Sequence, residues 1–555
     1  MTAHEVLDRD AIGQATAVAA GEVDPAELIT ASVDRIERLD IGLRAVVSTR
    51  GTAALAELHH GRQSSPFFGV PLLLKDHLCE LAGEPLWYGL KPLLDADHRP
   101  DVDSHLAVRF RDAGFAILGR TVTSELALAI TPESDVFPPP RNPWDPHRSP
   151  GGSSAGAAVS VAARMVPVAH GTDMAGSIRV PAAWCGVVGL KPSRGRISGG
   201  PTFGDHAVGL TQQFVLCRSV RDAAAILDAV ACQEPGDPLT APPPTRTWRS
   251  TLHDQTDPLR IGVVTESSWT GPVDPQIRHA VHEIADLLDD AGHEVVQAAP
   301  PALSETGYRQ AHALIVAAHA RDEMRRLGRL IGRQITEEEI GLATAWLVEC
   351  GRDLSATGLL DTVRFVHGWA RRCVSWWSSE RSSRDTPTHG DGFDLLLTPT
   401  VPNLAPPIGS VDETAATVFT GAFNLTGQPA ISLPTHVSRE GLPIGVQLVA
   451  APWREDHLFR VASQLEAATA WQDRRPNLAA HVAEHQDAGV GSSRESVGAS
   501  IGRPAVPTQR DVSRATTRRH PLGRQGSSRS VPDGSGDAAV GPRQRDTSNG
   551  QENPR

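Results

Sequence analysis

Two segments rich in glycine and serine, at residues 151–156 and 171–177, carry residue types from which a chemical site can be built. They read Gly-Gly-Ser-Ser-Ala-Gly and Gly-Thr-Asp-Met-Ala-Gly-Ser. Small residues let backbone approach backbone, and glycine permits positive φ, so such turns can aim consecutive N–H groups into one concavity. A concavity of that kind suits either a phosphate or an oxyanion.

The residues that follow the glycines favour the oxyanion. A phosphate-binding loop would continue with Gly-Lys-Ser/Thr before a helix, and no lysine follows the glycines of either turn. One turn of this composition is most often purely structural, but two turns joined by a single helix–strand unit weaken that interpretation. The residues alone therefore predict an oxyanion site, without saying which side chain reacts.

A helix and a strand must hold the two turns together. The small residues at 157–164 predict a closely packed helix, and the apolar run at 165–170 predicts a short strand. Upstream, amphipathic helical patterns alternate with further apolar runs, which predicts an α/β fold with a largely buried sheet. The helical patterns include 25–39 and 105–113, and the runs include 69–75 and 115–119.

The second half of the chain continues this alternation after a run of three prolines at 242–244. Expected strands lie at 261–264, 294–296, 395–397 and 444–449, and expected helices lie at 277–291 and 457–468.

Residues 301–390 look mainly helical and carry four tryptophans, of which Trp369, Trp376 and Trp377 cluster. We interpret the tryptophans mainly as helical packing surface. The alternative is a pocket wall that offers apolar area to a substrate.

The end of the chain has a different composition. After Trp471 no aromatic residue occurs, and residues 473–555 are rich in Arg, Gly, Ser, Pro, Asp and Gln. A segment with so little to bury is predicted to be disordered. We expect an appendage without a function of its own rather than a binding arm.

Further motifs stand in order along the chain. Gly69-Val-Pro-Leu-Leu-Leu-Lys75-Asp76 precedes the two turns, and Ile-Arg-Val-Pro-Ala-Ala-Trp-Cys-Gly follows them at 178–186. Downstream come Thr-Pro-Thr-Val-Pro at 398–402, Phe-Asn-Leu-Thr-Gly-Gln-Pro-Ala at 423–430 and Gly-Leu-Pro-Ile-Gly-Val-Gln at 441–447. Together with the turns, these motifs resemble the amidase signature family over roughly residues 10–470.

The resemblance implies an α/β fold with one large domain at 1–472, built on a central mixed, twisted β-sheet flanked by helices. It also implies the roles of individual side chains. Ser177 matches the nucleophile, Ser153 matches the bridging serine that usually follows a cis peptide bond, and Lys75 matches the general base.

The resemblance places further residues around these three. The N–H groups of Met174, Ala175, Gly176 and Ser177 match the oxyanion hole. Ser154, Asp173 and Arg179 match positions that support the site through hydrogen bonds and an ion pair. Ala155 and Ala175 stand where the family often has glycine, and a positive φ at either would be strained.

The implied chemistry explains why these residue types are needed. A serine hydroxyl is a poor nucleophile unless a base takes its proton, and lysine is a base only when neutral. Burial favours the neutral form and lowers a lysine pKa from about 10.4 towards neutrality. The apolar run before Lys75 is consistent with a buried strand, although an exposed structural lysine would be the default without the resemblance. Ser153 would relay the proton and return it to the leaving amine.

Other functions compete with a stand-alone amidase that cleaves a carboxylic amide. His170 and Asp173 near Ser177 could suggest a Ser–His–Asp triad, but His170 has no motif of its own. The glutaminase subunit of a tRNA-dependent amidotransferase is the main alternative, since it shares this fold. That glutaminase typically continues with Ala-Ser-Ser-Leu-Asp, where this chain reads Phe-Gly-Asp-His-Ala-Val-Gly-Leu-Thr at 203–211.

The bulk properties limit the partners and the location. The net charge of −12 gives no electrostatic case for nucleic acid or anionic lipid. No run approaches the length of a membrane span, and the six cysteines are scattered, as in a cytoplasmic protein. No cofactor or metal is expected, because His59, His60 and the cysteines lack ligand spacing. We expect a small amide as substrate, with pocket shape set by 301–390 and the 200–215 loop, and a homodimer as a candidate assembly.

Overall fold

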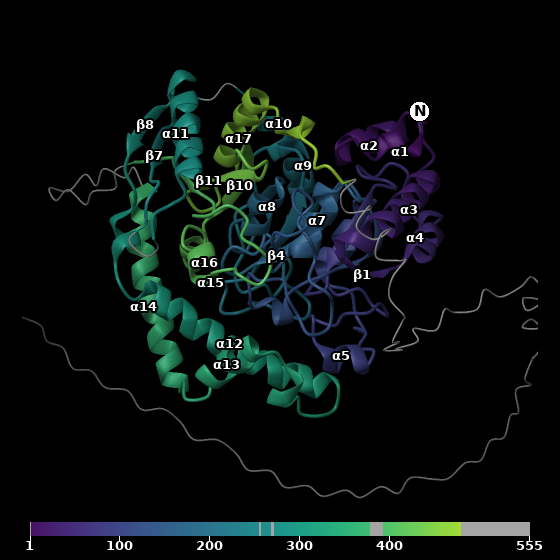
Figure 1. Cartoon of the computed structure of the whole chain (residues 1–555), viewed down its shortest axis with the longest axis horizontal. Coiled ribbons are helices and arrows are strands. Elements are labelled where there is room, and N and C mark those ends of the chain that lie inside the picture. Colours follow the sequence, from purple (N-terminus) through teal and green to yellow (C-terminus); the bar gives the residue numbers. More distant parts are fainter. Residues whose placement is uncertain (1, 255–256, 268–270, 378–391, 479–555) are drawn as a thin grey trace, which may run out of the picture. The chain divides into compact units, whose positions relative to one another are not determined.

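The computed structural model describes residues 2–254, 257–267, 271–377 and 392–478. At its centre lies an 11-stranded sheet with the order β1-β3-β2-β4-β6-β5-β10-β11-β9-β7-β8 (Figure 1). The strands are β1 Val46–Thr49, β2 Pro71–Lys75, β3 Ala116–Thr121, β4 Val168–Asp173, β5 Val188–Lys191, β6 Gln212–Cys217, β7 Arg260–Val263, β8 Glu294–Gln297, β9 Leu395–Pro399, β10 Ala430–Val437 and β11 Pro443–Ala450.

The sheet mixes parallel and antiparallel pairs. β2 lies parallel to β3 and β4, and β7 lies parallel to β8 and β9, whereas the other neighbouring pairs are antiparallel. Every residue of β2 to β6 is buried. Strands buried on both faces read as continuous apolar runs rather than alternating ones. The predicted α/β fold with a mixed, helix-flanked sheet is confirmed.

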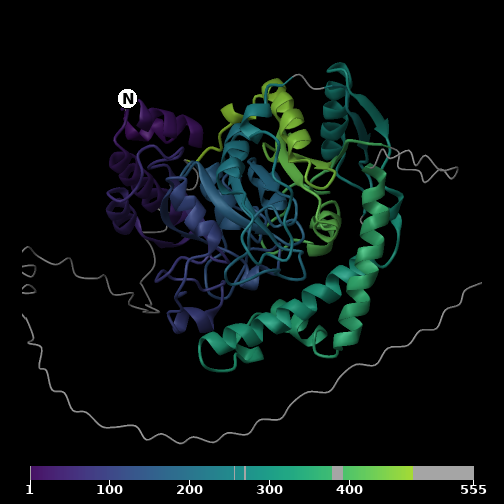
Figure 2. The ribbon, with the colours of Figure 1, turned by 180° about the vertical axis from the view of Figure 1, so that it is seen from behind.

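Helices pack against this sheet, and a further group lies together after β8. α7 contacts β2, β3, β4 and β6, whereas α8 contacts β5, β10 and β11. Figure 1 and Figure 2 show α12, α13 and α14 beside one another. The helices are α1 Ala3–Val6, α2 Ala11–Ala19, α3 Pro25–Leu43, α4 Gly51–Leu58, α5 Lys91–Asp95, α6 His105–Asp112, α7 Ala155–Ala162, α8 Arg179–Cys185, α9 Val220–Val230, α10 Trp248–Thr251, α11 Pro275–Asp290, α12 Tyr308–Leu330, α13 Leu342–Cys350, α14 Ala356–Val374, α15 Glu413–Ala416, α16 Ala422–Thr426 and α17 Glu455–Thr469.

Local sequence signals set where the predicted helices begin. Asp24 caps α3 by accepting the Ala26 N–H at 2.8 Å, and proline at the first helical position suits the fixed φ of a helix start. Ser104 caps α6 in the same way by accepting the Ala107 N–H at 3.2 Å.

The elements around the two glycine-serine turns extend further into them than predicted. α7 begins at Ala155, so the end of the first turn is already helical. β4 ends at Asp173, because its antiparallel ladder with β6 continues to the pair Asp173–Gln212. The second turn is therefore confined to the residues between Asp173 and α8.

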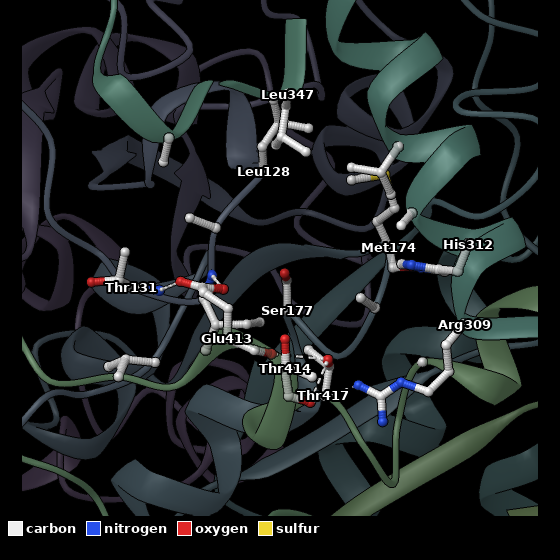
Figure 3. A pocket seen from close by; sticks show the side chains of 18 of the residues that line it. Leu128, Thr131, Met174, Ser177, Arg309, His312, Leu347, Glu413, Thr414 and Thr417 are labelled. Carbon is white, nitrogen blue, oxygen red and sulfur yellow. Dashed lines mark hydrogen bonds between the residues drawn. The ribbon is translucent and has the colours of Figure 1, made fainter. Parts of the chain in front are cut away.

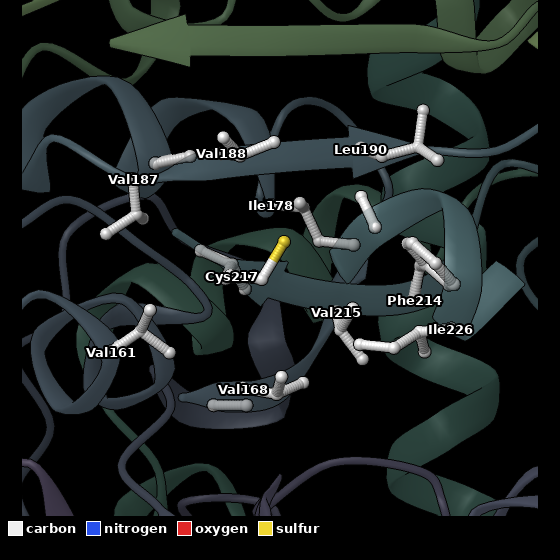
Figure 4. Close-up of a cluster of buried hydrophobic side chains, with 14 of the residues drawn as sticks. Val161, Val168, Ile178, Val187, Val188, Leu190, Phe214, Val215, Cys217 and Ile226 are labelled. Carbon is white, nitrogen blue, oxygen red and sulfur yellow. The ribbon is translucent and has the colours of Figure 1, made fainter. Parts of the chain in front are cut away.

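A tightly packed apolar cluster fixes these elements relative to one another (Figure 4). Val161 of α7, Val168 of β4, Val188 of β5 and Cys217 of β6 belong to it, and each has no exposed surface. Because close-packed interiors resist displacement, this cluster gives both turns a rigid base.

The predicted helical insertion at 301–390 contains α12, α13 and α14 in its described part. Trp369, Trp376 and Trp377 are buried in one apolar cluster, and Trp369 stacks on Tyr308 at 4.5 Å between ring centroids. The packing interpretation is thus correct for these three. Trp346 differs, since it is 66% exposed.

Contacts with the fold continue slightly beyond residue 472. Arg474 donates to the carbonyl oxygens of Pro434 and Thr435 at 2.9 and 2.8 Å, and Arg475 pairs with Asp8 at 2.7 Å. The rest of the predicted disordered tail, 479–555, lies outside the described residues. Within the described part, no helix combines the length and apolarity needed to cross a membrane.

Candidate active site

Lys75 ends the buried strand β2, as the apolar run predicts, and its side chain has no exposed surface. Its Nζ lies 2.7 Å from the Ser153 Oγ and 2.8 Å from the Thr172 Oγ1. Burial lowers the pKa of Lys75 well below its usual value, and the negative charge of Asp173 opposes that shift only in part. The geometry therefore places a readily deprotonated amine against a serine hydroxyl.

Ser153 follows a cis peptide bond from Gly152, as the resemblance implies. Glycine is required before it, because a Cβ on Gly152 would lie 2.7 Å from the carbonyl oxygen of Ile130. The next residue joins the two turns. The Ser154 N–H donates to the Ser177 carbonyl at 3.2 Å, and the Ser154 hydroxyl donates to the Thr172 carbonyl at 3.2 Å.

Ser177 lies in the turn between β4 and α8 and is 4% exposed. We call residues 174–177, whose N–H groups are the predicted oxyanion hole, the oxyanion loop. Its carbonyls are held from outside: the Met174 oxygen accepts from His312 Nε2 at 3.2 Å, and the Ala175 oxygen accepts from Thr420 Oγ1 at 2.5 Å. Ala155 and Ala175 both avoid positive φ, so the strain expected of a left-handed alanine does not arise.

Asp173 and Arg179 form a buried ion pair at the base of this loop. Both side chains have no exposed surface, and two guanidinium nitrogens donate to the carboxylate at 2.9 Å each. Burial alone would raise the pKa of Asp173, but the charge and hydrogen bonds of Arg179, helped by Asn424, lower it to about 2. Asp173 is therefore ionised, and it also accepts the Ile178 N–H at 3.2 Å where α8 begins.

His170 has partners unrelated to Ser177. Its Nδ1 accepts the backbone N–H of Lys75 at 3.3 Å, and its Nε2 lies 3.2 Å from Gln213 Oε1. Burial and the nearby charge of Lys75 lower its pKa to about 3. The Ser–His–Asp alternative has no support in this geometry. No group of three His, Cys, Asp or Glu suited to a metal occurs among the described residues.

A cavity of about 740 Å³ opens on Ser177 (Figure 3). Its walls are largely apolar, with Leu128 and Leu347 at one side, and Glu413 and Arg309 are polar members. The Glu413 carboxylate accepts the N–H groups of Ile130 and Thr131 at 2.6 and 2.7 Å, which holds the 127–133 wall in place.

The source of these walls corrects part of the sequence prediction. Residues of α12 and α13, including Trp346, line the cavity, as expected of the 301–390 insertion. The 200–215 loop contributes no lining residue among those described; segments 127–133 and 409–425 line it instead. Hydrogen bonds draw the 409–425 segment towards β4, since Asn424 Nδ2 donates to the Asp173 carbonyl at 2.9 Å.

Several residues that complete the site carry no role in the sequence prediction. Thr172 gives Lys75 a second hydrogen-bond acceptor, and Asn424 and Gln447 accept from Arg179 at 2.6 and 2.8 Å. Asn424 and Gln447 belong to motifs that support the resemblance, so the sequence marks both positions although it does not show that they bind Arg179. Thr172 stands in the glycine-serine segment 171–177, at the end of β4, whereas nothing in the local sequence distinguishes His312.

Comparison with known proteins places this geometry in a family. The Amidase family model matches residues 27–459. The chain is 37% identical over 492 residues to the 6-aminohexanoate-cyclic-dimer hydrolase of Paenarthrobacter ureafaciens, which covers 85% of this chain and 97% of that protein. It is 34% identical over 493 residues to one of the subunits of the glutamyl-tRNA(Gln) amidotransferase of Acidothermus cellulolyticus, over 84% and 95% of the two chains.

Solved structures agree with these relatives. The structure of 6-aminohexanoate cyclic dimer hydrolase complexed with substrate matches with a TM-score of 0.80 at 36% identity, over 85% of this chain and 99% of that one. A bacterial aryl acylamidase matches with a TM-score of 0.76 at 25% identity, over 84% and 98%. With a family match over most of its length and whole-chain relatives above 30% identity, this chain belongs to the amidase signature family of amide hydrolases.

Proposed function

We propose that this chain is a stand-alone amidase that works through an acyl-enzyme on Ser177, with Lys75 as general base and Ser153 as proton relay. The observation that carries the proposal is the contact of 2.7 Å between the buried Lys75 Nζ and the Ser153 Oγ. An amine whose pKa is lowered by burial can accept a proton near neutral pH.

The proposed steps balance their protons within these three side chains. Ser153 gives its proton to neutral Lys75 and takes the proton of Ser177, whose oxygen attacks the amide carbonyl. The N–H groups of Met174, Ala175, Gly176 and Ser177 stabilise the oxyanion of the tetrahedral intermediate. The proton then returns through Ser153 to the leaving amine, and water hydrolyses the ester on Ser177 by the same path.

The cavity supports an uncharged, mainly apolar amide as substrate. Most of its lining side chains are aliphatic or aromatic, and its volume of about 740 Å³ suits a small molecule. A relative named for a cyclic dimer of 6-aminohexanoate, 37% identical, supports amides with methylene chains, linear or cyclic. Aryl amides, peptide amides and carbamates belong in the same test.

The second candidate is the glutaminase subunit of a tRNA-dependent amidotransferase, which the 34% identical relatives support. Residues 203–211 lack the serine-rich continuation typical of that glutaminase, which favours the stand-alone enzyme.

An amide panel with a mutant control tests the proposal. Purified protein is given the 6-aminohexanoate cyclic dimer, its linear dimer, an aryl amide, a peptide amide, a carbamate and glutamine, and the newly formed amino group or ammonia is measured. We expect turnover of at least one non-glutamine amide, and none by Ser177→Ala with an unchanged circular dichroism spectrum. Turnover retained in Ser177→Ala would rule out the mechanism, and activity on glutamine alone would favour the amidotransferase.

A further inference from the structure

We infer that His312 and Thr420 are positioning residues that aim the N–H groups of the oxyanion loop, an inference that rests on the proposed function. They come from different segments, α12 and the turn before α16, yet they bind consecutive carbonyls of that loop. His312 Nε2 donates to Met174 at 3.2 Å, and Thr420 Oγ1 donates to Ala175 at 2.5 Å.

Holding a carbonyl fixes the N–H group of the same peptide unit. A trans peptide is planar, so its C=O and its N–H point in opposite directions. The contact of His312 with the Met174 oxygen therefore directs the Ala175 N–H away from His312. The contact of Thr420 with the Ala175 oxygen likewise directs the Gly176 N–H away from Thr420. Donors that are oriented before the reaction stabilise an oxyanion without a cost of reorganisation.

The packing around Thr420 is built for this contact. Gly176 has φ +140, and a Cβ there would lie 2.4 Å from the Thr420 Oγ1, so only glycine allows the approach. Thr420 has no exposed surface, and its own carbonyl accepts from Arg179 Nη1 at 3.0 Å. The buried Asp173–Arg179 pair thus holds Thr420 against the loop.

His312 links the loop to the wall of the substrate cavity. Its side chain lines the cavity beside Met174 (Figure 3). Because a carbonyl oxygen only accepts, the His312 ring must carry its proton on Nε2. Burial lowers the pKa of His312, which favours this neutral form. The helical insertion therefore supplies a side chain that sets the geometry of the reacting loop as well as the shape of the cavity.

The test uses two pairs of substitutions and a probe that needs no knowledge of the substrate. An alkyl fluorophosphonate reacts with the proposed nucleophile. During that reaction its phosphoryl oxygen gains negative charge at the position where the oxyanion of an amide substrate would form. His312→Leu and Thr420→Val each remove the hydrogen-bond donor at their position, whereas His312→Gln and Thr420→Ser each keep a donor there. We expect His312→Leu and Thr420→Val to react with the probe about 10–100-fold more slowly than wild type, since loss of one oxyanion donor itself costs about 10²–10³-fold. The donor-keeping variants should retain at least about a third of the wild-type rate.

Controls separate positioning from stability. Melting temperature is measured for all four variants. His312→Ala and Thr420→Ala replace the donor-lacking variants if these do not fold, and His312→Asn replaces His312→Gln. Equal slowing in the donor-keeping and donor-lacking variants, or no slowing in folded His312→Leu and Thr420→Val, would overturn the inference. If wild type is not labelled at Ser177, as read by peptide mass, the proposed function itself fails. Labelling at Ser177 at an equal rate in every variant rejects the positioning role alone.

Discussion

Lys75 illustrates how burial of a single residue can lower the pKa of an amine. It is one of three lysines in the chain, and β2 carries it into the sheet with no exposed surface. Two hydroxyl groups, from Ser153 and Thr172, are its hydrogen-bond partners, and neither carries a charge. For an amine without a paired carboxylate, burial destabilises the charged form more than the neighbouring groups stabilise it, so the neutral form is favoured.

The pH profile should reflect this lysine. Its pKa in the folded enzyme is depressed from 10.5, so the protonated form, inactive under the proposed mechanism, predominates only below that lowered pKa. We expect kcat/KM to rise with pH along an ascending limb that reflects the loss of one proton, and then to level off. The midpoint of that limb should lie well below 10.5. Lys75→Arg, which stays protonated, should lose at least about 10²-fold in kcat/KM.

Lys91 provides the matched control for that profile. Its side chain is 64% exposed and pairs with Asp95 at 2.6 Å. Lys91→Met should leave the limb and its midpoint unchanged. A profile with no ascending one-proton limb below pH 10.5, or a Lys75→Arg enzyme of undiminished activity, would contradict the role of Lys75 as base.

At the scale of elements, local sequence patterns predicted individual buried strands. The apolar runs foretold β2, β3 and β4 to within about three residues, because buried strands must be continuously apolar. Contacts between distant segments could not be predicted in this way. Asn424 lies 251 residues after Asp173, and no spacing rule says which distant side chain completes a buried ion pair.

The same reasoning explains the error about the cavity wall. Residues 200–215 follow soon after the motif at 178–186, but closeness in sequence to a motif does not place a loop at the site. In the structure, residues 409–425 reach Ser177 instead, because Asn424 and Thr420 bind β4 and the oxyanion loop. The helical pattern of residues 301–377 extends over a long stretch, and the structure places α12, α13 and α14 there.

Two tryptophans of that insertion should behave oppositely when they are truncated. Trp346 on α13 is 66% exposed and lines the cavity, so Trp346→Ala removes apolar contact with substrate. We expect KM to rise about 3–10-fold, which corresponds to roughly 1 kcal/mol of apolar contact, with kcat little changed. Its free energy of unfolding should stay within about 0.5 kcal/mol of wild type.

Trp369 on α14 is the control. It is fully buried, and its Nε1 donates to the Ala302 carbonyl at 2.8 Å. Trp369→Ala should lower the free energy of unfolding by about 3–5 kcal/mol in urea titration. If Trp346→Ala instead destabilised the fold as much as Trp369→Ala, its assignment to the cavity wall would be wrong.

At the scale of the whole molecule, the contacts of the fold extend a little past the point where the composition changes. That change occurs at 473, but Arg474 reaches back to the β10 region and to Thr469. Composition reports how much a segment can bury, whereas one guanidinium can join a fold through hydrogen bonds alone. Cytoplasmic location and a homodimer stay predictions, since they depend on surroundings outside a single chain.

Two truncations should distinguish the residues that stabilise the end of the fold from any residues that contribute to catalysis. A chain ending at Leu478 keeps every contact of Arg474 and Arg475, so its melting temperature and kcat/KM should equal those of the full chain. A chain ending at Gln472 loses three hydrogen bonds from Arg474 to the carbonyl oxygens of Pro434, Thr435 and Thr469. We expect it to be less stable by about 1–3 kcal/mol, because hydrogen bonds from a charged donor are lost. Its kcat/KM should be unchanged where it is folded, since the bonds lost lie outside the Lys75–Ser153–Ser177 site. A lower kcat/KM for the chain ending at Leu478 would instead assign residues 479–555 a part in the reaction.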